Sequence, residues 1–166
     1  MRYLGNKTKL LPFIDSVIKK YNIEGETFAD LFAGTGTVGD HFKQDYQVIS
    51  NDFLYFSYVI NKAKLLNATP PKFQKFRKKY NKEIFSWLNE LFFSPTDYYF
   101  IYNNYSPVGE RYFFSEKNAI KIDGIRIKIE ELLLEELLND AEYYFLLASL
   151  LESVTKVANT SGTFEA

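Results

Sequence analysis

Three closely spaced glycines give the sequence its clearest chemical pattern. Gly34, Gly36 and Gly39 match G-x-G-x-x-G within DLFAGTGTVG, residues 30–39. Glycine is needed where the backbone must approach a ligand closely or adopt φ angles that other residues resist. A helix that follows such a turn presents N–H groups and a partial positive charge to an anion. The pattern predicts a nucleotide-type ligand whose anionic part is a pyrophosphate or a methionine carboxylate.

Two acidic residues flank the glycine pattern and help to choose the ligand. Asp52 comes 16 residues after Gly36, near the spacing expected for an acid that accepts hydrogen bonds from ribose hydroxyls. Asp30 precedes Gly34 by four residues. Its charge would repel a pyrophosphate but would suit the amine and sulfonium of S-adenosylmethionine, and a buried carboxylate needs such a partner. These acids favour S-adenosylmethionine over a nicotinamide dinucleotide.

An aromatic residue, a glycine and a lysine stand just before the first predicted helix. They are Tyr3, Gly5 and Lys7. Lys7 is placed to pair with a carboxylate, and Tyr3 to pack on a cofactor. An NAD-dependent oxidoreductase, the alternative function, would use Asp52 and the glycines but would leave Asp30 and the segment from Tyr3 to Lys7 unexplained.

The elements that must position these residues alternate between helix and strand. Apolar spacing predicts a helix over residues 9–21, and short buried strands over 27–32 and 47–50. Helices are expected from 38 to 43 and from 53 to 67. A strand, a glycine turn, a helix and a second strand form the first half of a doubly wound α/β unit.

The second half of the chain, after Pro70-Pro71, reads as mainly helical. The predictions are a helix over 72–93, a loop over 94–112, a helix over 116–138 capped by Ser115, and a last helix to about residue 158. Asn139 and Glu142 have the spacing of a capping box at its start. We therefore expect a cofactor-binding α/β part over residues 1–68 and a helical part over 69–166 leading toward target recognition. Together they would form one incomplete domain.

Composition excludes several kinds of site. The 166 residues include no Cys, which excludes disulfides and thiolate metal sites. His41 is the only His, so the sequence argues against a metal cluster or catalytic triad built on histidine. No metal ligand is assigned. The N-terminus lacks an apolar signal core and no apolar run could span a bilayer, so a reducing, cytoplasmic setting is expected.

The net charge of −1 hides an uneven charge distribution. Residues 72–82 carry six basic side chains, whereas residues 130–142 carry six acids and no base. The basic run is a candidate for contact with DNA phosphates. The alternative interpretation is the solvated face of a helix. The candidate DNA-binding residues are Lys72, Lys75, Arg77, Lys78 and Lys79.

Taken together, these segments resemble the Dam-like class of adenine-specific DNA methyltransferases. In that class an aromatic-Gly-Lys segment, here Tyr3, Gly5 and Lys7, precedes an F-x-G-x-G motif, here Phe32, Gly34 and Gly36. Residues 51–52, 104–107, 111–113, 142–152 and 156–162 also fit. The resemblance implies a partial Rossmann-like fold, S-adenosylmethionine as cofactor and double-stranded DNA as substrate, with restriction-modification as the setting. It implies a cofactor site lined by Tyr3, Lys7, Asp30, Phe32, Gly34, Gly36, Asp52 and Phe53, with Phe53 packed on the adenine ring.

The chain departs from this class at the catalytic motif. Such enzymes flip the target adenine out of the duplex and hold its amine with a D-P-P-Y-type motif, whereas the only Pro-Pro pair here lies in TPPK, residues 69–72. No catalytic residue is assigned, and the chain alone is expected not to methylate DNA. The alternatives are a non-catalytic cofactor-binding half that needs a separate second half, and an RNA methyltransferase.

Overall fold

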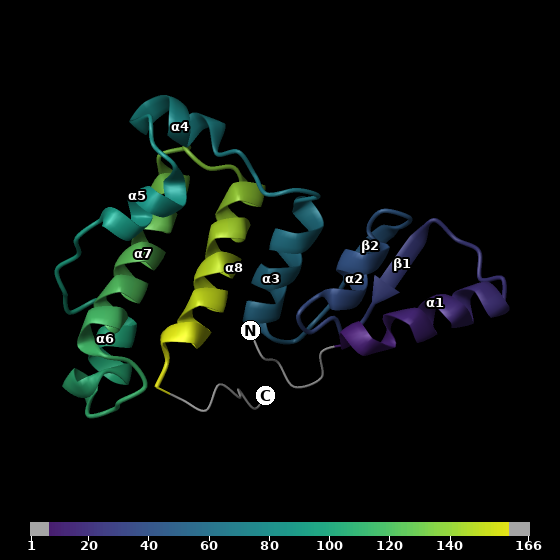
Figure 1. Ribbon diagram of the computed structural model, residues 1–166, viewed down its shortest axis with the longest axis horizontal. Helices are drawn as coiled ribbons and strands as arrows, with labels where there is room; N and C mark the ends of the chain where they lie inside the picture. The colour runs from purple at the N-terminus through teal and green to yellow at the C-terminus, as the bar shows by residue number, and fades with distance from the viewer. Residues whose placement is uncertain (1–6, 160–166) are drawn as a thin grey trace. The chain divides into compact units, whose positions relative to one another are not determined.

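The computed structural model describes residues 7–159, which divide into two compact units at Thr69 and Pro70. The first unit begins with a short 3-10 helix, η1 (Lys7–Leu10), and the amphipathic helix α1 (Leu11–Lys20). Strand β1 (Thr27–Asp30), helix α2 (Thr37–Phe42), strand β2 (Gln47–Ser50) and helix α3 (Tyr55–Leu66) follow (Figure 1). The predicted order of strand, glycine turn, helix and strand is confirmed.

The two strands are parallel and in register from Thr27 opposite Gln47 to Asp30 opposite Ser50. Helix α2 packs on both strands and on α3. Its Phe42 ring stacks on Phe28 of β1 with 4.5 Å between centroids. Because parallel strands end at the same edge, this packing brings the residues after β1 and β2 together.

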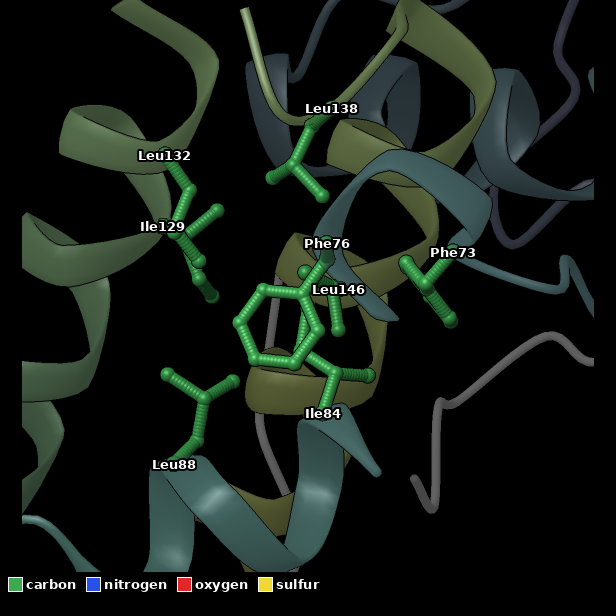
Figure 2. Close-up of a cluster of buried hydrophobic side chains, with 8 residues drawn as sticks. All are labelled: Phe73, Phe76, Ile84, Leu88, Ile129, Leu132, Leu138 and Leu146. Atoms are coloured by element: carbon green, nitrogen blue, oxygen red, sulfur yellow. The ribbon is translucent and has the colours of Figure 1, made fainter. Parts of the chain in front are cut away.

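The second unit is helical. It contains α4 (Gln74–Tyr80), α5 (Ile84–Glu90), α6 (Phe100–Tyr105), the 3-10 turn η2 (Pro107–Gly109), α7 (Glu116–Leu134) and α8 (Asp140–Val157). Helices α7 and α8 form a hairpin (Figure 1). Their facing residues and those of α4 and α5 meet in one apolar core (Figure 2), whose buried side chains are Phe73, Phe76, Ile84, Leu88, Ile129, Leu132, Leu138 and Leu146. Each such side chain stabilises the unit by roughly 1.5–3 kcal/mol.

Two of the predictions for this half were wrong. A single helix over 72–93 is replaced by α4 and α5, because Asn81 adopts a left-handed conformation with φ of 49° and ends α4. Glu83 then caps α5 by accepting a hydrogen bond from the Ser86 N–H at 2.9 Å. The predicted loop over 94–112 contains α6, which forms because buried Asp123 of α7 accepts the Tyr102 N–H at 2.8 Å.

The predicted caps of the last two helices are confirmed. The Ser115 side chain accepts the Asn118 N–H at the start of α7, and Asn139 and Glu142 form the reciprocal capping box of α8. Helix α7 ends at Leu134, four residues before the predicted end, and a turn with Glu136 at φ of 57° follows. None of the helices in residues 7–159 combines the length and the apolar character that crossing a membrane would require.

Candidate functional site

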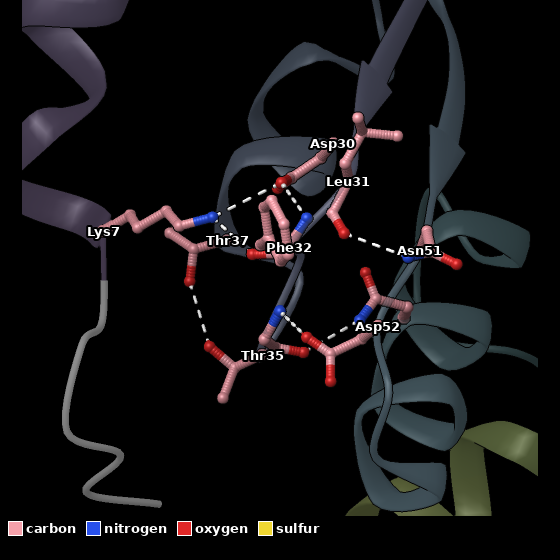
Figure 3. A network of polar contacts seen from close by, with 10 residues as sticks. Lys7, Asp30, Leu31, Phe32, Thr35, Thr37, Asn51 and Asp52 are labelled. Carbon is pink, nitrogen blue, oxygen red and sulfur yellow. Dashed lines mark hydrogen bonds and ion pairs between the residues drawn. The ribbon is translucent and has the colours of Figure 1, made fainter.

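The ends of the two strands are joined directly by backbone hydrogen bonds. The Asn51 N–H donates to the Asp30 carbonyl at 2.8 Å, and the Ala33 N–H donates to the Asn51 carbonyl at 2.9 Å. Asp30 and Asp52, which are 22 positions apart in the sequence, therefore lie on either side of the glycine turn (Figure 3). The structure thus brings together Asp30, Phe32, Gly34, Gly36, Asp52 and Lys7.

Asp30 is buried, and its two carboxylate oxygens have different surroundings. Oδ1 lies 3.3 Å from Lys7 Nζ and also accepts the Phe32 N–H at 3.3 Å. Oδ2 is buried with no hydrogen-bond partner among the described residues. An unpaired buried carboxylate oxygen is costly, so Oδ2 is a ready acceptor for a donor group of a ligand.

The Lys7 contact corrects one step of the sequence argument. A ligand cation was expected to supply the partner of Asp30, but the chain supplies Lys7 itself. The Lys7 ammonium also donates to the Phe32 carbonyl (Figure 3). Because the pair is close to neutral, repulsion by Asp30 is a weaker argument against a pyrophosphate than the sequence alone indicated.

The glycine turn has the backbone conformation that its residues predict. Gly34 and Gly36 have positive φ angles of 52° and 68°. At Gly36 there is a second reason for glycine, which the sequence did not reveal. A Cβ atom there would lie 2.5 Å from Asn61 Oδ1 on α3, so a side chain of this protein, rather than a ligand, fills the space beside Gly36.

Asp52 links the glycine turn to the loop after β2. Its Oδ2 accepts the Gly34 N–H at 2.7 Å, and its Oδ1 accepts the Leu54 N–H at 3.0 Å. The Leu54 N–H, together with that of Gly34, holds the pKa of the Asp52 carboxyl below its ordinary value of 3.8, although partial burial acts in the opposite direction. Asp52 is therefore ionised at neutral pH. Its predicted ribose contact remains a prediction.

Two aromatic rings project from the loops at this edge. Phe53 is 99% exposed and Phe32 is 81% exposed. Both rings are available to stack on a planar ligand group. A depression of about 360 Å³ lies beside β2 and α3, with Asp52, Asn61 and Tyr58 among its lining residues. Tyr3, the remaining predicted cofactor residue, lies outside the described residues.

The basic run is partly paired with the acidic run. In the helical unit, Lys79 forms an ion pair with Glu135 at 2.7 Å, and Lys75 donates to the Glu136 carbonyl at 3.1 Å. The contact raises the pKa of the Lys79 ammonium and lowers that of the Glu135 carboxyl. Lys72, Arg77 and Lys78 are exposed. DNA contact by the basic run remains a prediction. The best candidates for it are these three residues, because Lys75 and Lys79 are bound to the residues that follow α7.

The sequence interpretation missed the α3 residues that bind the glycine turn. Asn61 Nδ2 donates to the Gly34 carbonyl at 3.0 Å, and Lys64 Nζ donates to the Thr35 carbonyl at 2.8 Å. The sequence did contain a signal for them, because Asn61 and Lys64 are three residues apart and therefore share one face of the helix. Asn61 also lies among the apolar residues of that helix, where a polar side chain needs a partner.

The chain belongs to the D12 class N6 adenine-specific DNA methyltransferase family, whose profile matches residues 3–166. It is 63% identical over its whole length to "Modification methylase LlaI" of Lactococcus lactis subsp. lactis and 44% identical to "Type II methyltransferase M.FokI" of Planomicrobium okeanokoites. It covers 27% and 26% of these two proteins. It also covers 48% of "Type II methyltransferase M.NlaIII" of Neisseria lactamica, at 39% identity. No solved structure gives a significant match.

Proposed function

We propose that this chain is the S-adenosylmethionine-binding part of a site-specific adenine DNA methyltransferase of a restriction-modification system. Enzymes of the D12 class take their methyl group from S-adenosylmethionine. Two relatives, at 63% and 41% identity, are named modification methylases. Because the chain spans about a quarter of their length, methylation itself is assigned to the longer protein.

The buried Asp30 Oδ2, which has no hydrogen-bond partner within residues 7–159, carries this proposal. It lies at the end of β1, beside a turn whose glycines have positive φ, and it is chemically suited to accept hydrogen bonds from the amino group of S-adenosylmethionine. Asp52, kept ionised by backbone N–H groups, would accept from ribose hydroxyls. The exposed rings of Phe53 and Phe32 would stack on the adenine.

The bound cofactor would supply an electrophilic methyl group for the exocyclic amine of adenine. The residues of this chain would only bind and orient it, because the sequence contains no D-P-P-Y-type motif to hold the target base. We assign that motif to another part of the longer protein. This chain alone is then expected to bind the cofactor without methylating DNA.

We also infer that β1 and β2 belong to a Rossmann-like sheet with further strands, on which α2 packs. A two-stranded sheet is marginal in water, and Ile49 in the middle of β2 is 54% exposed. Additional strands from the longer protein would pair with the open strand edges, and an element packed on the face of the sheet would cover this side chain. The helical unit would contribute DNA contacts, with Lys72, Arg77 and Lys78 as the candidates.

Isothermal titration calorimetry of the 166-residue chain tests the cofactor assignment. We expect heat on titration with S-adenosylmethionine and none with NAD. Asp30→Asn should weaken binding about tenfold or more, because a hydrogen bond to a charged group is lost. Asp45→Asn, the same charge change at an exposed position after α2, is the matched control. Binding of NAD alone, or equal binding by both variants and the native chain, would refute the assignment.

A further inference from the structure

The glycine turn is held by its carbonyl groups. Each carbonyl from Leu31 to Thr35 accepts a hydrogen bond from this chain. In order along the turn, the donors are Asn51 Nδ2, Lys7 Nζ, the Gly36 N–H, Asn61 Nδ2 and Lys64 Nζ. Two of these donors, Asn61 and Lys64, come from α3, so this helix fixes the second half of the turn.

Asn61 is fixed in a single orientation by its surroundings. Its side-chain nitrogen donates both to the Gly34 carbonyl at 3.0 Å and to the Ser57 carbonyl of its own helix at 2.8 Å. A flipped amide would place an oxygen against both carbonyls. The Oδ1 atom is consequently left buried, without a partner among the described residues, next to Gly36. A buried oxygen without a partner costs stability. A side chain selected for stability alone would avoid this cost.

The contact with Gly34 determines where the next amide points. In a trans peptide the carbonyl and the following N–H point in opposite directions. Because Asn61 draws the Gly34 carbonyl toward α3, the Thr35 N–H points away from α3. This N–H donates to no group among the described residues. It is therefore a free donor in the turn, close to the Gly34 N–H that Asp52 already binds.

We propose that Asn61 is a positioning residue that orients the Gly34–Thr35 peptide so that the Thr35 N–H donates to an acceptor of the bound cofactor. The inference rests on the proposed function for the identity of that ligand, S-adenosylmethionine. The peptide orientation itself does not depend on it. Asn61 acts through its hydrogen bond to the Gly34 carbonyl, so the proposed effect on binding is indirect.

Two variants and a matched control separate this role from simple stabilisation. Asn61→Leu removes the amide but keeps the branching of its heavy atoms, and Asn61→Ala is the second variant in case the larger leucine does not fold. Asn67→Ala is the control, because Asn67 lies at the end of the same helix and donates to the Ala63 carbonyl at 2.9 Å. This bond resembles that from Asn61 to Ser57 but does not reach the turn.

The readouts are the amide cross-peaks of Gly34, Thr35 and Gly36 in nitrogen-proton NMR spectra and the dissociation constant for S-adenosylmethionine. We expect the Asn61 variants to move these cross-peaks and to weaken binding about tenfold, the effect of one lost hydrogen bond to a charged group. The Asn67 control should change neither. Unmoved cross-peaks, or unchanged affinity with moved cross-peaks, would overturn the inference. If the native chain does not bind S-adenosylmethionine but the cross-peaks move, the proposed function fails while the orienting role of Asn61 stands.

Discussion

Replacing Gly36 by alanine separates two physical reasons for the glycine. The φ angle of 68° costs an L-residue about 1–2 kcal/mol. The new Cβ would also lie 2.5 Å from Asn61 Oδ1, and overpacking of this kind costs typically about 1–3 kcal/mol. The lower entropy of the unfolded alanine chain returns about 0.4–1 kcal/mol. We therefore expect Gly36→Ala to lower the free energy of unfolding by about 1–5 kcal/mol.

A double-mutant cycle with Asn61→Ala tests this reasoning. In that background the collision is absent, so Gly36→Ala should cost only the backbone strain, about 1 kcal/mol net. Urea unfolding of the four proteins, followed by far-ultraviolet circular dichroism, gives the four free energies. An equal cost of Gly36→Ala in both backgrounds would show that Asn61 does not require the glycine, and the reasoning about the contact would be refuted.

Three further predictions concern packing, pH and charge. Gly124→Ala should destabilise the chain by about 1–3 kcal/mol in urea unfolding, because the new Cβ would lie 2.2 Å from the Phe93 ring. In a Phe93→Ala background the same substitution should stabilise the chain, since alanine favours a helix over glycine by about 1 kcal/mol. The pKa of Asp52 in the folded chain is lowered, so the contribution of Asp52 to stability is present above pH 3.8 and is lost as pH falls through the folded pKa. In thermal unfolding, the Asp52→Asn variant should therefore lose less stability on acidification than the native chain. Identical acid profiles of the two proteins would contradict this. Lys78→Gln should reduce the slope of log DNA affinity against log salt by about 0.9, measured by fluorescence anisotropy; Lys79→Gln should change it less because Lys79 is already paired with Glu135, and equal slopes would remove Lys78 from the interface.

Local signals predicted the first unit well. Residues 47–50 form the predicted strand, and Asp30 and Asp52 reach the same sheet edge because the parallel strands end there. Hydrophobic spacing and the glycine pattern act within a few residues of each element, so the sequence contains them directly. The capping box of Asn139 and Glu142 is equally local and was predicted for the same reason.

The wrong predictions depended on contacts that are distant in the sequence. The break after α4 required Asn81 to adopt a positive φ, which a continuous apolar stripe conceals. Helix α6 depends on Asp123, 21 positions after Tyr102. The pairing of Lys79 with Glu135 joins two runs that the sequence shows only as opposite charges. The site residue Asn61 was missed for this reason too, because its partner Gly34 lies 27 positions earlier.

The selectivity of the proposed site then depends on individual atoms more than on net charge. With Lys7 beside it, Asp30 contributes little net field, but its Oδ2 atom remains an acceptor that only a donor group can satisfy. An amino group meets that requirement, whereas a pyrophosphate, which offers only acceptor oxygens, does not. The Thr35 N–H makes the opposite demand, for an acceptor. One buried acceptor and one free donor at the same turn match an amino acid, which carries both an ammonium and a carboxylate, better than they match a pyrophosphate.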